Sequence, residues 1–153
     1  MLLRQKEAKE EVMTISEMIG SSKYFHGTSN VYLRNIQQHG IKINEKGRLY
    51  LTTNPFTAQV EAFNTVIGDL GYGITSWPPK PKEIKSPGTG GKAVVIELDP
   101  KYIDSSKLRP DPEYPSEDQA YYIDYDLPAQ AIININILGS EPGRDIIDYW
   151  MGV

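Results

Sequence analysis

The amino-acid sequence predicts an α+β fold, with helices in the first half of the chain and strands in succession after them. Apolar residues recur at helical spacing near the N-terminus, and a strong helix start stands at Asn54-Pro55. Apolar runs without a helical repeat dominate from residue 93 onward. The length of 153 residues and the apolar share of 39% fit a soluble globular protein with one core.

The N-terminal residues predict an amphipathic helix over 2–19 that ends at Gly20. Its apolar face repeats at intervals of four, three and four residues, with Ala8, Val12, Ile15 and Ile19. We expect residues 1–22 to form this separate helix and residues 23–139 to form the main domain. Residues 140–153 should add a short helix packed on that domain.

A second helix is predicted over residues 30–39. Ser29 or Asn30 can cap its first turn, because a short polar side chain accepts a hydrogen bond from a free backbone N–H there. Gly40 follows the last turn and can end the helix. His39 lies within that turn, where a cation complements the helix dipole.

A strand over residues 47–53 and a helix over 56–66 form the next pair of elements. The strand carries alternating apolar and polar side chains. The start of the helix is unusually clear, because Asn54 is a good N-cap and Pro55 suits the first helical position. Its inward side chains are predicted to be Val60, Phe63 and Val66 or Ile67.

The rest of the chain alternates between long irregular segments and strands. Residues 68–92 and 107–118 are rich in proline and glycine and are predicted as loops, the first of them a candidate lid. The later regular elements are strands over 93–98, 119–125 and 131–138 and a short helix over 144–151.

Composition excludes several classes of site and partner. The chain has no cysteine, so disulfides, thiolate zinc sites and cysteine nucleophiles are absent. Its net charge of −4 argues against sequence-independent binding of nucleic acid. No run of eighteen apolar residues predicts a membrane span, so we expect a cytoplasmic protein. The acidic segment 111–115 lacks the spacing of a calcium loop, and we expect no metal.

Of the two histidines, His26 is the better candidate for function. It follows an aromatic pair and precedes Gly27, which allows a ligand to approach the backbone closely. Thr28 and Ser29 add two hydroxyls immediately afterwards. This local pattern favours a binding role over a purely structural one.

Short motifs around His26 recur in an order that resembles a known family. They are Tyr24-Phe25-His26-Gly27-Thr28-Ser29, Leu33-x-x-Ile36-x-x-x-Gly40-Ile41, Leu49-Tyr50-Leu51-Thr52-Thr53, Ala58-x-x-x-Ala62, Val94-Val95-Ile96-Glu97-Leu98, Leu108-x-x-Asp111, Tyr122-Ile123 and Leu127-Pro128-x-x-Ala131-Ile132. Together they resemble the ADP-ribosyltransferase superfamily, in the branch with a His-Tyr-Glu triad that includes diphtheria-toxin-like and poly(ADP-ribose) polymerase-like domains. The resemblance covers residues 23–138. It implies split mixed or antiparallel β-sheets with helices packed on them, here with an extra N-terminal helix.

The resemblance implies that NAD is the substrate, and it assigns residues to its binding. His26 would hydrogen-bond a ribose hydroxyl, and Gly27 would present its backbone to the nicotinamide carboxamide. Tyr50 would pack against the nicotinamide ring. Thr28 would add a hydroxyl beside His26, and a second hydroxyl, from Thr52 or Thr57, would support the carboxamide.

Two further positions implied by the resemblance are less well matched. The family's catalytic glutamate aligns with Gln119, while a shift of two residues would make Glu117 the acid. Glutamine keeps the hydrogen-bonding shape but carries no charge. The aromatic residue that closes the other side of the nicotinamide ring has only Phe63 as a counterpart. Trp77 or Tyr72 of the long loop is an alternative lid aromatic.

These observations predict an NAD-dependent mono-ADP-ribosyltransferase that moves ADP-ribose to an unidentified acceptor and releases nicotinamide. The acceptor can be protein, nucleic acid or a small molecule. Alternatives are a catalytically impaired module that binds NAD or ADP-ribose, and an NAD glycohydrolase. An RNA 2′-phosphotransferase-like activity is more distant, because that family needs a further histidine and several arginines, whereas this chain has five arginines in all.

Overall fold

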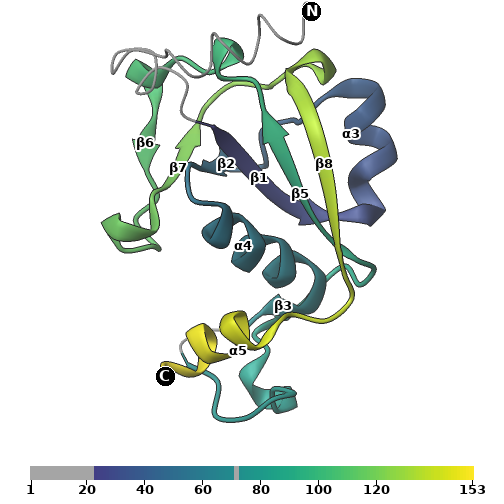
Figure 1. Cartoon of the computed structure of the whole chain (residues 1–153), viewed down its shortest axis with the longest axis vertical. Helices are drawn as coiled ribbons and strands as arrows, with labels where there is room; N and C mark the ends of the chain where they lie inside the picture. The colour runs from purple at the N-terminus through teal and green to yellow at the C-terminus, as the bar shows by residue number, and fades with distance from the viewer. Residues whose placement is uncertain (1–22, 71–72) are drawn as a thin grey trace, which may run out of the picture.

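The structure is a computed structural model that describes residues 23–70 and 73–153, and the predicted helix over 2–19 lies outside them. The described part has an α+β fold, with three α-helices, a six-stranded sheet and a two-stranded sheet (Figure 1). The helices are α3 (Leu33–His39), α4 (Pro55–Ile67) and α5 (Arg144–Met151). None of the described helices is long and apolar enough to cross a membrane.

The six-stranded sheet has the order β6-β7-β2-β1-β5-β8, and every pair of neighbours is antiparallel. Its strands are β1 (Tyr24–Ser29), β2 (Leu49–Thr52), β5 (Ala93–Leu98), β6 (Arg109–Pro110), β7 (Ala120–Ile123) and β8 (Ile132–Gly139). The small sheet pairs β3 (Gly68–Asp69) with β4 (Ser86–Pro87). The strands thus form one large and one very small antiparallel sheet.

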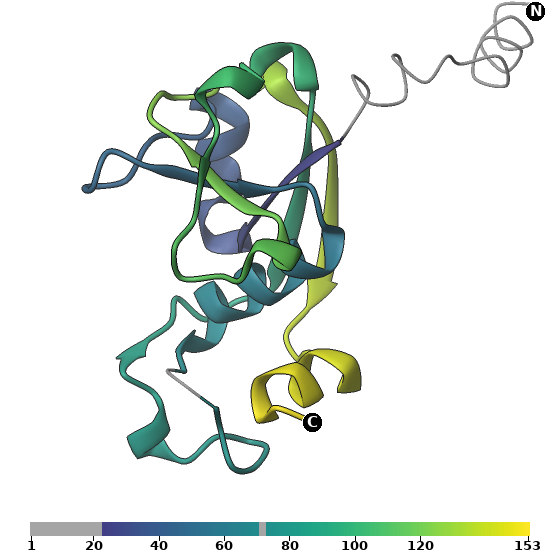
Figure 2. The same cartoon turned by 90° about the vertical axis from the view of Figure 1, so that its left-hand side faces the viewer.

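The large sheet separates two hydrophobic clusters because side chains alternate between its faces. Within β5, Val94 and Ile96 belong to the cluster beneath α3, whereas Val95 belongs to the cluster beneath α4 and α5. The C-terminal helix α5 contributes Ile146 and Trp150 to the second cluster. Figure 2 shows α5 and the segment after α4 together at one end of the molecule.

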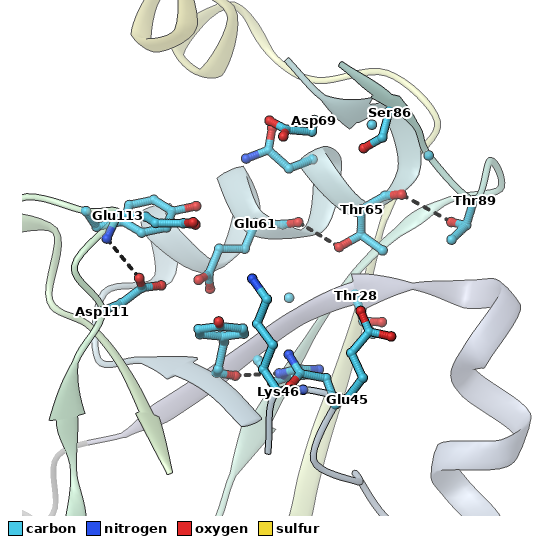
Figure 3. Close-up of a pocket in the computed structure, with 18 of the residues that line it drawn as sticks. Thr28, Glu45, Lys46, Glu61, Thr65, Asp69, Ser86, Thr89, Asp111 and Glu113 are labelled. Carbon is cyan, nitrogen blue, oxygen red and sulfur yellow. Dashed lines mark hydrogen bonds between the residues drawn. The ribbon is translucent and has the colours of Figure 1, made fainter. Parts of the chain in front are cut away.

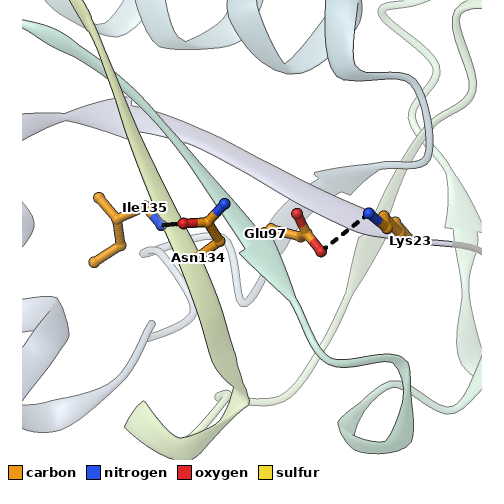
Figure 4. A network of polar contacts seen from close by, with 4 residues as sticks. All are labelled: Lys23, Glu97, Asn134 and Ile135. Carbon is orange, nitrogen blue, oxygen red and sulfur yellow. Dashed lines mark hydrogen bonds and ion pairs between the residues drawn. The ribbon is translucent and has the colours of Figure 1, made fainter. Parts of the chain in front are cut away.

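Most predicted elements occur with shifted ends. The helix at Asn54 begins as expected, since the Asn54 side chain accepts a hydrogen bond from the Phe56 N–H and Pro55 opens the helix. The strand predicted over 119–125 is shorter, and β1 runs further than its aromatic start suggested, through Ser29. At the beginning of β1, Lys23 forms an ion pair of 3.6 Å with Glu97 of β5 (Figure 4).

Gly27 allows α4 to lie directly against β1. A Cβ atom at Gly27 would lie 2.2 Å from the Ala58 carbonyl oxygen and 2.7 Å from the Ala62 nitrogen. Both clashing atoms belong to the helix backbone, so no side-chain rotation can relieve the contact. The small residues Ala58 and Ala62 face the strand at this point, and together with Gly27 they set the distance between helix and sheet.

We predict that Gly27→Ala destabilises the fold by about 3 kcal/mol, because α4 must move away from β1. For a chain of this size that corresponds to a fall in Tm of roughly 6–12 °C. Gly143→Ala is the control, since an added methyl group there meets only the Asp145 carboxylate oxygen, at 3.0 Å. Thermal denaturation followed by circular dichroism measures both. Equal Tm values for the two variants would contradict the proposed contact.

Candidate functional site

β1 and β2 separate after a single paired position, and this opens the candidate site. The register between them joins Phe25 to Thr52 alone. Beyond that pair the His26 side chain spans the opening, and its Nδ1 lies 2.6 Å from the Tyr50 carbonyl oxygen. An imidazole therefore replaces the backbone hydrogen bond that a continuing ladder would make.

The bond to Tyr50 fixes the protonation of His26. A carbonyl oxygen only accepts, so Nδ1 must carry the proton and donate it. Burial lowers the pKa of His26 and outweighs the opposing effect of the bond to the Tyr50 carbonyl, so the ring is neutral at pH 7. Nε2 then keeps its lone pair and can accept a hydrogen bond from a ligand hydroxyl.

Two hollows meet at this opening. The larger has a volume of about 640 Å³ and the smaller about 370 Å³, both in the range of small-molecule sites. Four residues line both hollows: His26, Thr28, Asn44 and Tyr50. Gly27 lines the larger one. The structure therefore brings together four of the residues proposed from sequence, namely His26, Gly27, Thr28 and Tyr50.

The two hollows have opposite charge. The larger is lined by five carboxyl-bearing residues and a single lysine: Glu45, Glu61, Asp69, Asp111, Glu113 and Lys46 (Figure 3). The smaller is lined by Lys42 and Arg48, and none of its lining residues is acidic. A ligand that spans both hollows thus meets an acidic environment at one end and a basic one at the other.

Glu61 reaches the larger hollow from α4, and sequence reasoning did not select it. In Figure 3 its side chain extends from the helix into the hollow between Asp111 and Lys46. Residues spaced three or four apart share a helix face, and Thr65 accordingly lines the same hollow. Burial, together with the nearby charge of Asp111, raises the pKa of Glu61 to about 8.

Asp111 forms the opposite wall and was also missed as a site residue. It is 4% exposed, and its backbone N–H donates to the Ala120 carbonyl, which holds it against β7. Its Oδ1 accepts the Glu113 N–H at 3.0 Å, so the carboxylate has a fixed orientation. The motif Leu108-x-x-Asp111 includes this aspartate, but the sequence indicated no role for it in the site.

Tyr50 is held in place by its neighbours. Its ring meets Tyr122 of β7 edge to face, with centroids 6.2 Å apart. Arg48 lies over the Tyr122 ring at 4.2 Å and donates a hydrogen bond to the Tyr50 side chain. This cluster positions the Tyr50 ring at the junction of the hollows.

Gln119 and Glu117, proposed as catalytic residues, do not line either hollow. Gln119 adopts a left-handed conformation, with φ of 55°, and its Oε1 accepts the Thr53 hydroxyl at 2.8 Å. This turn directs the Gln119 side chain to the molecular surface, and Glu117 is exposed beside it. Neither residue proposed as the acid from the sequence therefore reaches the two hollows.

Thr52 and Thr57, proposed to support a carboxamide, also lie elsewhere. Both are buried, and both donate to backbone carbonyls of the turn before β7. Thr52 donates to Gln119 at 2.7 Å and Thr57 donates to Asp118 at 2.7 Å. Through these hydrogen bonds Thr52 of β2 and Thr57 of α4 hold the turn in place, and their hydroxyls are not free to bind a ligand.

Phe63 and Trp77 are likewise outside the hollows. Phe63 is 3% exposed and packs in the core, since two residues along a helix turn the side chain by about 200° from Glu61. Trp77 stacks on Trp150 of α5, with centroids 5.8 Å apart, and does not act as a lid. Tyr72 lies outside the described residues.

Comparison of the sequence with models of known protein families and with curated proteins finds no match. Among residues 23–70 and 73–153, no three His, Cys, Asp or Glu side chains are grouped so that they could hold a metal ion. The chemistry of the site must therefore be argued from its own residues.

The raised pKa of Glu61 predicts that stability falls between pH 4.5 and pH 8. The folded state holds this proton more tightly than the unfolded state, so raising the pH favours unfolding. The full effect is at most about 5 kcal/mol, and solvent around this partly exposed side chain reduces it. Glu61→Gln should therefore be more stable than the parent at pH 8 and similar to it at pH 5.

Urea unfolding at both pH values measures this difference. Glu117→Gln is the control, because that glutamate is exposed and outside the hollows. A Glu61→Gln variant that loses stability with pH as steeply as the parent would show that Glu61 does not hold the proton.

Proposed function

We propose that this protein binds NAD across the two hollows and transfers ADP-ribose from it to an acceptor, with release of nicotinamide. The junction of two oppositely charged hollows at His26 and Tyr50 carries this proposal. NAD has a cationic nicotinamide ring at one end and an anionic pyrophosphate linked to adenosine at the other. Its charges match an acidic and a basic hollow placed side by side.

This charge pattern sets the direction of the dinucleotide. The nicotinamide riboside belongs in the larger hollow, where Glu61 and Asp111 face a cation. The ADP part belongs in the smaller hollow, where Arg48 supplies positive charge, together with Lys42, which is paired with Asp126 at 3.8 Å. The reverse orientation would place phosphate groups among five carboxyl-bearing residues and is disfavoured.

The junction residues suit the part of the molecule that reacts. Neutral His26 can accept a hydrogen bond at Nε2 from a hydroxyl of the nicotinamide ribose. Tyr50, fixed by Tyr122 and Arg48, offers an aromatic face to the flat nicotinamide ring. The Gly27 backbone is accessible in the same hollow.

Asp111 and Glu61 supply the carboxyl groups of the site, a role that the sequence had assigned to Gln119 or Glu117. When the bond between the ribose carbon C1′ and nicotinamide breaks, its electron pair leaves with nicotinamide and positive charge develops on the sugar. A fixed carboxylate facing that charge stabilises the transition state. Asp111, oriented by the Glu113 N–H, is the residue we assign to this role, and Glu61 is its neighbour.

The order of the motifs supports a finer description of the fold. The His26 motif lies on β1, the Tyr50 motif on β2, and the Ala58 motif on the helix between β2 and β3. We propose that the domain has an ADP-ribosyltransferase-like arrangement. The antiparallel pairing of β1 with both β2 and β5 agrees with this proposal.

The first test is binding. His26→Ala should weaken NAD binding about ten- to a hundredfold, because it removes a hydrogen bond and opens the contact with Tyr50. His39→Ala is the matched control, since His39 is the exposed histidine at the end of α3. Isothermal titration calorimetry with NAD measures both. Failure of the parent protein to bind NAD at millimolar concentration would refute the proposed function.

The second test asks whether Asp111 or position 119 provides the catalytic carboxyl group. Asp111→Asn should slow nicotinamide release about a hundred- to a thousandfold while the protein still binds NAD. Asp124→Asn, at an exposed aspartate outside the hollows, should leave the rate unchanged. Gln119→Glu should also have no effect, because the side chain points to the surface. A tenfold gain of rate in Gln119→Glu would instead return the acid role to that position.

The products distinguish the alternatives. Labelled NAD that yields labelled macromolecule or small acceptor indicates a transferase, whereas free ADP-ribose alone indicates a glycohydrolase. Binding without release of nicotinamide indicates a module that binds NAD but does not cleave it. An RNA 2′-phosphotransferase-like activity is disfavoured because that family needs a further histidine and several arginines, whereas Arg48 is the only arginine among the described residues that lines either hollow.

A further inference from the structure

Acidic side chains continue along one wall of the larger hollow beyond the junction residues. After β6 the chain turns through residues 111–114, and the Tyr114 N–H donates to the Asp111 carbonyl to close the turn. Glu113 and Tyr114 line the hollow from this turn. Figure 3 shows Asp111 and Glu113 on the other side of Glu61 from Thr28 and Thr89.

Glu61 projects into the space beside this turn without a partner of its own. Its carboxyl group makes no hydrogen bond or ion pair with the described residues, although its backbone carbonyl accepts the Thr65 hydroxyl. It lies near Asp111, and burial together with that charge raises its pKa. A cation between the two carboxyl groups would interact with both and would favour the ionised form of Glu61, because it offsets the repulsion from Asp111.

Tyr114 adds an aromatic surface to the same space. Its side chain hydrogen-bonds Asn64 of α4, which fixes the ring across from the helix, and burial raises the pKa of its hydroxyl, which therefore stays protonated. Aromatic faces attract cations, and more strongly where the site is partly desolvated. Carboxyl groups and a tyrosine ring thus converge on one region of the hollow.

We infer that the acceptor of ADP-ribose is a cationic nitrogen compound, an amine or a guanidinium group, which enters along the wall formed by Asp111, Glu113 and Tyr114. This inference rests on the proposed function. Acceptors that carry phosphate or carboxylate groups would meet like charges along the same wall and are disfavoured. The charge pattern therefore selects among the acceptor classes that the sequence left open.

The transfer step balances with the groups present. The Asp111 carboxylate takes one proton from the cationic acceptor nitrogen, and the electron pair of that N–H bond forms the new bond to C1′ of the ribose. The bond from C1′ to nicotinamide breaks in the same step. Nicotinamide leaves as a neutral molecule with the electron pair of that bond.

The experiment compares acceptors at low salt with labelled NAD. Agmatine and 1,5-diaminopentane serve as small cations, and a peptide rich in arginine and lysine tests whether the cation can belong to a protein. Sorbitol and single-stranded DNA are the neutral and anionic acceptors. Labelled product should form at least ten times faster with a cationic acceptor than with sorbitol or DNA, and the ratio should fall as salt is added.

Two charge-reversal variants test whether this wall attracts the cationic acceptor. Glu113→Lys should lower transfer to the cationic acceptor at least tenfold, relative to hydrolysis of NAD in the same sample, through a higher KM for the acceptor. Glu117→Lys makes the same change of charge four residues later, at an exposed position outside the hollow, and should behave as the parent. Equal losses in the two variants would mean that general surface charge, and not this wall, attracts the acceptor, which overturns the inference.

The outcomes also separate this inference from the proposed function. If the protein does not bind NAD, both the proposed function and the acceptor assignment are wrong. Cleavage of NAD without any labelled cation, or equal labelling of sorbitol or DNA, overturns the acceptor assignment and leaves NAD cleavage intact. Preferential labelling that depends on Glu113 and not on Glu117 supports it, and the small-molecule and peptide arms then show which source of cation the protein uses.

Discussion

The candidate site depends on the hydrogen bond from His26 Nδ1 to the Tyr50 carbonyl. Two antiparallel strands that paired along their whole length would close the opening, because each backbone group would find its partner across the ladder. Here β1 and β2 pair at one position only, and the imidazole spans the gap beyond it. The same bond fixes the tautomer of His26 and places Tyr50 where the two hollows meet. The His26 side chain thus spans the gap between β1 and β2, has a tautomer fixed by the Tyr50 carbonyl, and lies where the two hollows meet.

The helix α4 provides the second constraint, and a glycine on β1 makes it possible. Because Gly27 has no Cβ, the helix backbone approaches the strand closely, and Ala58 and Ala62 occupy the face in contact. A helix in this position directs Glu61 into the larger hollow. The first turn of α4 is also held in place, because the Thr57 hydroxyl donates a hydrogen bond to the Asp118 carbonyl in the turn before β7. Packing of α4 therefore connects the core directly to the acidic part of the site.

Local patterns predicted one half of this site and could not predict the other. His26 and Gly27 stood out through their local pattern, and Tyr50 was assigned through the family resemblance of its motif. The structure places all three at the opening. Asp111 reaches the hollow only because β6 pairs with β7, a contact between segments that no local pattern encodes. Gln119, which was aligned by residue type, lies in a left-handed turn that points its side chain away from the hollows, and residue type alone does not encode that turn.

For Glu61 a signal did exist in the sequence. Ala58 and Ala62, four residues apart, suggest a helix face that packs closely, and at 100° per residue Glu61 and Thr65 fall on a neighbouring face. That geometry directs the Glu61 carboxyl group, and not the Phe63 ring, toward the larger hollow. Phe63 was chosen by chemistry alone, but the helix buries it in the core.

The energetics of Glu61 connect stability with the proposed binding. A carboxyl group that must stay protonated to pH 8 lowers the stability of the empty protein at neutral and higher pH, because its ionisation is opposed by burial and by Asp111. A cationic ring or acceptor nitrogen beside it reverses both effects, since it favours the ionised form and offsets the repulsion between the two carboxyl groups. Part of the binding free energy of a cation would therefore come from relieving a cost already present in the fold. Strain of this kind is found where a site is arranged for a ligand and not for the stability of the free chain.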